Sequence, residues 1–288
     1  MTKHAAFYVP LTAAALALTG GVSAWAAPAS APTSAVAPAN VSAGVPVGAL
    51  RLSMPGGGWS YDGATGPEHW GEVAPTCAST PTSKQSPVDL PLHSLTESRK
   101  VKAPVLDYER AEFSVRDTGE TIQGDLTTVG PNAVTLDGTR YELQQFHLHT
   151  PSEHTIDGEP AAMELHLVHR SAGGRLAVLG VLLELGRENA ALDGFFDAIP
   201  AAAAATSSVA PRPVQVNPAH LVPAWSDLVR YDGSLTTPPC SEGVLWSVYE
   251  RPRMISKAQL GAFTAVHPEN SRPVQPLNGR SLFEVDVH

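Results

Sequence analysis

Glycine and proline interrupt the chain so densely from Trp59 onward that only short regular segments fit between them. Several of the intervening runs have the composition of strands, namely 113–115, 141–149, 164–170, 176–185 and 244–249. Turn signals are Asp137-Gly138, Asp157-Gly158, Gly173-Gly174 and Asp232-Gly233. Two stretches favour helices, 188–198 and 256–266, the second with Ser256 as a candidate N-cap. This pattern predicts a mainly β chain (α+β) in which a sheet carries short peripheral helices.

The first fifty residues differ from the rest, because Lys3 is the single charged residue among them. An apolar stretch at 7–19 is too short to span a bilayer, and Ala24-Trp25-Ala26 fits a signal-peptide cleavage site. We therefore predict a signal peptide at 1–26 and export to the periplasm or the extracellular space, with a membrane anchor or a disordered tail as alternatives. Residues 27–55, rich in alanine and proline, are predicted to form a disordered spacer before a single domain at 56–288.

Charge and cysteine content exclude several classes of protein. A net charge of −9 argues against a nucleic-acid partner, which would require a basic stripe. No later apolar stretch reaches transmembrane length, so we do not expect an integral membrane protein after signal cleavage. In an exported chain the only two cysteines, Cys77 and Cys240, favour one disulfide bond, with two buried free thiols as the alternative.

Histidines are concentrated in one segment, since five of the eleven lie between positions 147 and 169. On a strand, His147 and His149 point to one face, while Phe146 and Leu148 point to the other, into a core. A His-x-His pair alone is a weak sign of a metal site, because it also occurs by chance on solvated strands. A third histidine is therefore needed to make the prediction specific.

The following strand supplies that third histidine. His166 shares a face with Glu164, and antiparallel pairing of the two strands would bring His166 beside the His-x-His pair. Three imidazoles on one face form a zinc site with a fourth position open for water. Glu164 could orient a ligand histidine through its second ring nitrogen. A competing interpretation is the first half of a cupin motif, in which Glu153 would be a ligand of iron or manganese on a jelly-roll barrel.

The chain closely resembles the α-carbonic anhydrase family, of bacterial type, over about residues 59–284. The motifs that carry the resemblance are Gly66-Pro67-Glu68-His69-Trp70, Gln85-Ser86-Pro87-Val88-Asp89, Gln145 to His149, Ser152-Glu153-His154-Thr155, Glu164 to His169, Gly233 to Pro239 and Asn270 to Leu277. They occur in the family's order, and the cupin motif accounts for none of those outside the histidine segment. From the resemblance, we expect residues 56–288 to form an α-carbonic anhydrase-like catalytic domain.

The resemblance implies a central twisted, mostly antiparallel sheet of about ten strands with the active site in a conical cleft. It implies zinc-dependent reversible hydration of CO2 to bicarbonate and a proton, by attack of zinc hydroxide on CO2. The zinc ligands would be His147, His149 and His166. CO2 and bicarbonate would be the small-molecule partners, and the oligomeric state is left open, with a dimer as one option.

The resemblance also assigns roles around the metal. Thr236 would accept a hydrogen bond from the hydroxide and donate one to Glu153, while Gln145 and Glu164 would hold the zinc histidines. His154 and His169 would be buried structural histidines. The pocket for CO2 would be formed by Val168, Val178, Leu235, Val244 and Trp246, with Tyr61 and Thr237 bordering its water network.

One position departs from the family pattern. Many members carry Asn-Asn-Gly-His, whose histidine relays protons, whereas this chain has Asp117-Thr118-Gly119-Glu120. An ordinary glutamate has a pKa about 2.7 units below the value of about 7 known for zinc-bound water in carbonic anhydrase. Transfer to Glu120 would then be uphill by roughly 3.7 kcal/mol, so we expect slow proton export unless burial raises its pKa. A non-catalytic binding protein and a zinc esterase are the other functions left open.

Overall fold

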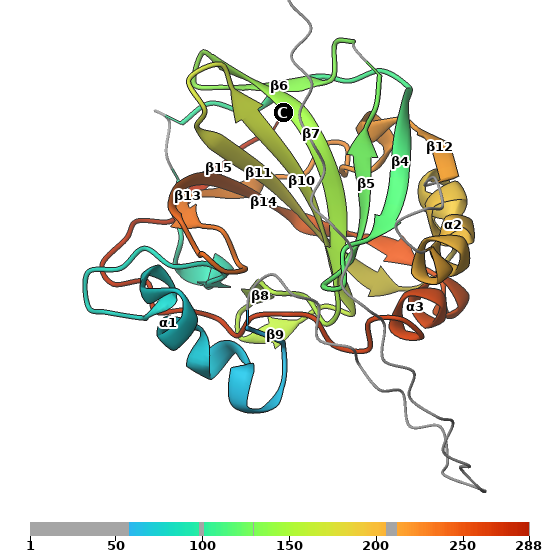
Figure 1. The fold of residues 1–288 in the computed structure, drawn as a ribbon. Helices are drawn as coiled ribbons and strands as arrows, with labels where there is room; N and C mark the ends of the chain where they lie inside the picture. Colours follow the sequence, from blue (N-terminus) through green and yellow to red (C-terminus); the bar gives the residue numbers. More distant parts are fainter. Residues whose placement is uncertain (1–57, 98–100, 129, 206–211, 288) are drawn as a thin grey trace, which may run out of the picture. The chain divides into compact units, whose positions relative to one another are not determined.

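The structure is a computed structural model that describes residues 58–97, 101–128, 130–205 and 212–287 (Figure 1). The predicted signal peptide at 1–26 and the predicted spacer at 27–55 lie outside the described residues. Among the helices of the described ranges, none is both long enough and apolar enough to cross a membrane.

Twelve strands of the described ranges form one sheet, in the order β12-β4-β5-β7-β10-β11-β14-β13-β15-β2, with β6 joining β7 and β3 joining β6. The strands are β2 (Thr96–Glu97), β3 (Val105–Asp107), β4 (Ala111–Asp117), β5 (Ile122–Leu126), β6 (Ala133–Leu136), β7 (Thr139–His149), β10 (Met163–Ser171), β11 (Leu176–Leu185), β12 (Arg212–Val216), β13 (Leu228–Ser234), β14 (Glu242–Ile255) and β15 (Phe283–Val285). Within this sheet of the described residues, only β11–β14 and β15–β2 pair in parallel. The predicted mostly antiparallel sheet is confirmed. A small second sheet contains β1 (Asp89–Leu90), β8 (Thr155–Ile156) and β9 (Glu159–Pro160).

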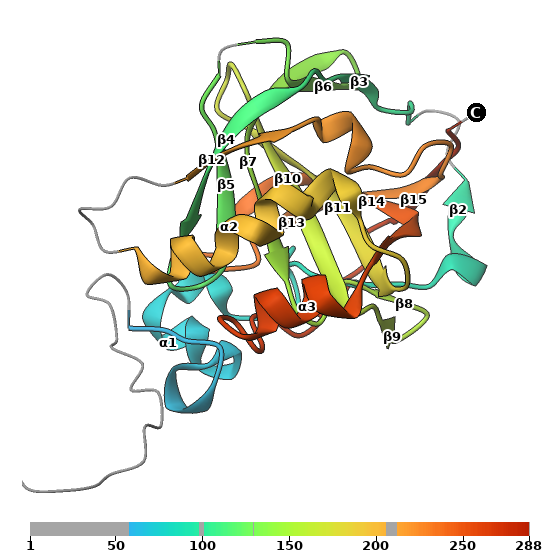
Figure 2. The same cartoon turned by 90° about the vertical axis from the view of Figure 1, so that its right-hand side faces the viewer.

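The helices are short, as predicted: α1 (Trp70–Val73), α2 (Asp193–Ala204) and α3 (Lys257–Thr264). Helices α2 and α3 cover one face of the large sheet (Figure 2). Ser256 caps α3, because its side chain accepts a hydrogen bond from the Gln259 backbone N–H and the Gln259 side-chain oxygen accepts one from the Ser256 backbone N–H.

Helix α2 begins five residues later than predicted. The Gln259 side chain binds both the backbone N–H and the C=O of Asn189, at 2.9 and 3.0 Å, which holds this residue outside the helix. A short 3-10 turn, η5 (Ala190–Leu192), then leads into α2. The helix continues through Pro200 to Ala204, because Phe195 and Ile199 are fully buried against the sheet and alanine has a high helix propensity.

Two of the predicted turn signals form two-residue hairpin loops with positive φ at both positions, Asp137-Gly138 between β6 and β7 and Asp157-Gly158 between β8 and β9. The Asp232-Gly233 turn prediction is wrong, since both residues lie within β13. A Cβ at Gly233 would lie 2.9 Å from Cδ1 of Trp246. This glycine therefore permits close side-chain packing instead of a turn.

Apolar side chains pack on both faces of the sheet. One cluster contains Phe146, Leu148 and Leu165 together with the buried faces of α2 and α3. The opposite cluster includes Val178 and Trp246. Because side chains alternate along β7 and β10, the predicted metal-binding histidines face this second side.

The predicted disulfide bond is present between Cys77 and Cys240, which are separated by 163 positions. Cys240 lies in the loop between β13 and β14, and Cys77 lies before β1. The bond therefore ties the loop after β13 to the N-terminal part of the described chain.

Candidate metal centre

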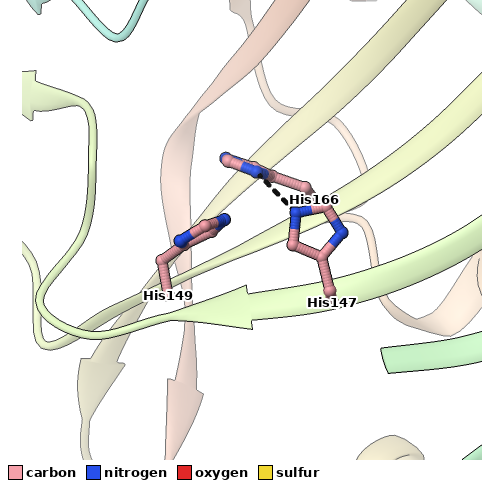
Figure 3. Close-up of side chains that lie close together, drawn as sticks. All are labelled: His147, His149 and His166. Carbon is pink, nitrogen blue, oxygen red and sulfur yellow. Dashed lines mark hydrogen bonds between the residues drawn. The ribbon is translucent and has the colours of Figure 1, made fainter. Parts of the chain in front are cut away.

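Strands β7 and β10 bring the three predicted ligands together. Their antiparallel register places His147 opposite His166, and His149 opposite Glu164. The three imidazole ring centroids lie 5.0, 5.1 and 4.7 Å apart, and the rings converge on one region (Figure 3). The strand pairing expected from the sequence is thus observed.

Each of the three rings has one nitrogen engaged by the surrounding protein. The contacts are His147 Nδ1 to Gln145 Oε1 at 2.8 Å, His149 Nδ1 to the Asn270 carbonyl at 2.7 Å, and His166 Nε2 to Glu164 Oε1 at 2.9 Å. All three partners are oxygen acceptors, so the engaged ring nitrogens must carry the protons. This arrangement fixes which nitrogens of the site are left as acceptors.

The remaining nitrogens are His147 Nε2, His149 Nε2 and His166 Nδ1, and the cluster allows one ligand atom per ring within 4.8 Å of the others. The contact of 3.4 Å drawn in Figure 3 joins His166 Nδ1 and His147 Nε2, two acceptors in this proton arrangement. His149 Nε2 is buried without a hydrogen-bond partner among the described residues. Three converging imidazole nitrogens with available lone pairs are a donor set that fits Zn²⁺.

The histidines also have the protonation state that a ligand needs. Burial lowers the pKa of His149 to about 4 and shifts the pKa of His147 well below its ordinary value. Burial likewise lowers the pKa of His166, although Glu164 opposes the shift. Neutral imidazoles are therefore available at neutral pH.

Glu164 anchors the base of the site with both carboxylate oxygens. Oε1 accepts from His166 and from His154 Nδ1 (2.7 Å), and Oε2 accepts from the backbone N–H groups of Glu153 and His154 at 2.9 and 2.8 Å. Burial alone would raise the pKa of Glu164, but the adjacent histidines hold it well below its ordinary value. His154 Nε2 in turn lies 2.7 Å from the Tyr231 hydroxyl. His154 is therefore engaged at both ring nitrogens.

Glu153 is buried beside the histidines. Its Oε1 accepts from the Arg272 backbone N–H at 2.9 Å, and its Oε2 lies 3.6 Å from His149 Nε2. Burial raises the pKa of Glu153 to about 7, although His166 and the hydrogen bond from the Arg272 backbone N–H oppose the shift. Thr236 is buried and lines the histidine cavity. Glu153 Oε2 has no hydrogen-bond partner among the described residues, so the Thr236–Glu153 hydrogen bond stays a prediction.

The histidines open into a cavity of about 420 Å³. Its lining includes most of the predicted site residues, namely Tyr61, Glu120, Gln145, Val168, Val178, Leu235, Thr236, Thr237 and Trp246. Val244 is not in this lining and is buried in the apolar cluster with Val178 and Trp246. The predicted metal ligands, catalytic residues and pocket residues thus line one cavity, apart from Val244, Glu153 and Glu164, which lie behind its lining.

Two supporting residues had no role assigned from the sequence, Asn270 and Arg272. They act through backbone groups, since the Asn270 carbonyl accepts from His149 and the Arg272 N–H donates to Glu153. A backbone contact gives no side-chain signal. The motif at 270–277 was the one available indication that this segment belongs to the site.

Known proteins resemble the chain over most of its length. A family model described as eukaryotic-type carbonic anhydrase matches residues 65–286. A carbonic anhydrase from Klebsiella pneumoniae is 41% identical over 230 residues, covering 78% of this chain and 90% of its own. The solved α-carbonic anhydrase of Photobacterium profundum shares 40% identity with a TM-score of 0.68, covering 78% of this chain and 99% of its own. That of Thermovibrio ammonificans, solved with the inhibitor sulfanilamide, shares 36% identity with a TM-score of 0.66 over 79% of this chain and 99% of its own.

Proposed function

The chain belongs to the eukaryotic-type carbonic anhydrase family, and from this premise we propose that it catalyses the reversible hydration of CO2 to bicarbonate and a proton with a bound zinc ion. The observation that carries the proposal is the convergence of three imidazole nitrogens whose partner ring nitrogens are all held by acceptors. His147, His149 and His166 hold the metal. When bound, zinc acts as a Lewis acid that makes a nucleophile available from water near neutral pH, an effect for which carbonic anhydrase is the standard example.

The protein residues orient the reaction. Thr236 accepts a hydrogen bond from the nucleophile and donates its own hydroxyl proton towards Glu153, which directs a lone pair of the nucleophile at the substrate carbon. Glu153 must be ionised for this role, and a nearby divalent cation lowers its pKa again. Gln145, Glu164 and the Asn270 carbonyl fix the orientation of the ligand rings.

The apolar part of the cavity suits a substrate with no net dipole. Val168, Val178, Leu235 and Trp246 line it on the side of β10, β11, β14 and the loop after β13. Val244 supports this wall from the core. We assign these residues to the CO2 pocket and Thr237 to its polar border.

Metal analysis combined with CO2-hydration kinetics tests the proposal. We expect one zinc per chain, loss of turnover on chelation and recovery when zinc is restored. His147→Ala should lose both zinc and activity, whereas His93→Ala, at an exposed position outside the cavity, should keep both. Zinc-loaded protein without CO2 hydration would contradict the proposal and would favour an esterase or a non-catalytic binding protein.

Inhibition gives a second test, since the Thermovibrio ammonificans enzyme was solved with sulfanilamide. We propose that sulfanilamide also binds this chain at the histidine cavity. It should compete with chelators for access to the metal and should not bind the His147→Ala variant. Equal binding to that variant would place the inhibitor elsewhere.

We also propose that residues 56–288 form the catalytic domain of an exported protein. The Cys77–Cys240 bond supports an oxidising compartment, and the 1–26 pattern supports a cleaved signal. N-terminal sequencing of protein recovered from the periplasm or the medium should begin at Ala27. A mature chain that still begins at Met1 would contradict this proposal.

A further inference from the structure

A second cavity, of about 700 Å³, lies among the ends of β11 and β14, the turn η5 and the loop between β12 and β13. It shares no lining residue with the histidine cavity. Arg251 lies five positions beyond Trp246 along β14, which corresponds to roughly 16 Å of extended strand. The two cavities are therefore separate sites on one strand.

Three arginines line this second cavity, Arg187, Arg251 and Arg253, and we call it the arginine pocket. Arg251 and Arg253 are two positions apart on β14, and Arg253 pairs with Leu183 of β11, the strand that Arg187 follows. The Gly186 N–H donates to the Ile255 carbonyl at 2.8 Å, which joins the two strand ends. The backbone thus brings three arginine residues to the lining of one cavity.

The positive charge of this pocket is not neutralised by ion pairs. Within the described ranges, no carboxylate oxygen lies within 4.0 Å of these three guanidinium groups, whereas Arg116, Arg140, Arg175 and Arg230 each have such a partner. Glu188 is the one carboxylate in the lining. In a chain of net charge −9, this local excess of positive charge is distinctive.

The arginine side chains of the lining have donor groups that suit an anion. The Arg253 side chain donates to the His220 carbonyl at 3.0 Å, which fixes its guanidinium at the pocket wall. Arginine presents several N–H donors in a plane, which match the oxygens of a phosphate group.

We propose that the arginine pocket binds a multivalent oxyanion of the phosphate class. The ligand is either a soluble phosphate compound or the head group of an anionic lipid, because both present the same group. The site is independent of the catalytic proposal, since none of its residues lines the histidine cavity.

Calorimetric titration of the zinc-loaded full chain with pyrophosphate at low ionic strength tests this site. We expect saturable binding of one pyrophosphate, weakened about tenfold or more by Arg251→Gln and by Arg253→Gln, because each removes charge-assisted hydrogen bonds. Arg170→Gln is the matched control, because Arg170 is exposed, has no carboxylate within 4.0 Å in the described ranges and lies outside the pocket. The control should bind as the wild type does, and all three variants should keep CO2 hydration.

Absence of saturable pyrophosphate binding, or unchanged affinity in both pocket variants, would overturn the proposal. Binding that persists in both variants and competes with sulfanilamide would place the anion at the histidine cavity instead. Co-sedimentation with phosphatidylglycerol vesicles, compared with phosphatidylcholine vesicles, separates the two sources. Vesicle binding lost in Arg251→Gln would identify a lipid head group, and pyrophosphate binding without vesicle binding would identify a soluble phosphate compound.

Discussion

From the sequence resemblance, we place Glu120 at the position where many α-carbonic anhydrases carry a proton-relaying histidine. It lies in the lining of the histidine cavity, and burial raises the pKa of its carboxyl, while His267 and Arg116 oppose the shift. A higher pKa reduces the uphill step expected for an ordinary glutamate. Glu120 is therefore better suited to accept a proton than its residue type alone suggests.

We expect proton transfer to the buffer to limit turnover of the wild type at low buffer concentration. Added imidazole should raise the CO2-hydration rate. Glu120→His should raise the rate at low buffer concentration, because the ordinary pKa of a histidine lies closer to neutrality than that of a glutamate. Glu120→Gln should slow turnover at low buffer and recover with imidazole. Stopped-flow rates measured against buffer concentration provide the check, and rates indifferent to both buffer and Glu120→His would reject a limiting proton step.

His169 illustrates a buried histidine outside the metal centre. It is fully buried, its Nε2 lies 2.6 Å from the Tyr108 hydroxyl, and burial lowers its pKa to about 4. Because the unfolded value is about 6.5, the unfolded chain binds more protons between these pH values. The stability contributed by His169 is complete above pH about 6.5 and is lost as pH falls towards 4.

We predict that His169→Gln removes this pH dependence. The difference in free energy of unfolding between wild type and variant should shrink by about 3 kcal/mol from pH 7.5 to pH 4, measured by denaturant titration. Tyr108→Phe is the control, because it removes the hydroxyl partner but leaves the buried imidazole. Its difference from the wild type should change far less with pH, and a constant difference for His169→Gln would contradict the assignment.

At the scale of elements, two glycines show how position decides the effect of the same substitution. In β13, a Cβ at Gly233 would meet Ser86 Oγ first, and it would lie 2.8 Å from Tyr231 Cε2 and 2.9 Å from Trp246 Cδ1. Trp246 lines the histidine cavity. In α3, a Cβ at Gly261 would meet nothing within 4 Å. One glycine is required by packing, and the other only lowers helix propensity.

Gly233→Ala should lower the free energy of unfolding by about 1–3 kcal/mol and reduce CO2 hydration, because the added Cβ crowds Ser86, Tyr231 and the cavity-lining Trp246. Gly261→Ala should raise the free energy of unfolding by about 0.5–1 kcal/mol without affecting activity. Thermal unfolding and hydration kinetics of the two variants measure both effects. A neutral Gly233→Ala variant would show that the strand can shift without disturbing the cavity.

The sequence predicted the strands around the site better than the helices. Alternation of apolar and histidine positions assigned the two faces of β7 and β10, because side chains on a strand alternate strictly. The predicted start of α2 was wrong, because Gln259, 70 positions away from Asn189, holds Asn189 outside the helix. The prediction of a turn at Gly233 was wrong, because this glycine instead makes room for the side chains of Ser86, Tyr231 and Trp246. A local sequence pattern carries no information about these contacts, because most of them join residues far apart in the chain.

At the scale of the whole molecule, the Cys77–Cys240 bond closes a loop that contains most of the described residues. Cross-linking so long a loop restricts the unfolded chain, with an entropic stabilisation near 5 kcal/mol in the chain-entropy model. The bond also fixes the loop that carries Thr236, which lies four residues before Cys240. It therefore acts on both stability and the site.

We predict that replacing both cysteines with serine lowers the free energy of unfolding by about 2–5 kcal/mol. Denaturant unfolding with and without reductant measures the effect. The wild type should lose stability in reductant, whereas the double variant should be indifferent to it. Equal stability of oxidised and reduced wild-type protein would show that the bond does not stabilise the fold.

By itself, the sequence determined the mainly β character, the disulfide pair as the favoured pairing and the shared face of His147 and His149, because each follows from local periodicity or from having only two cysteines. Motifs in the family's order also indicated the class of enzyme. Only the tertiary structure decided which ring nitrogens face one another, through the Asn270 carbonyl and the Glu164 carboxylate. It alone gathered three arginines into a second cavity. These contacts join segments far apart in the chain, so their geometry exists only after the sheet has closed.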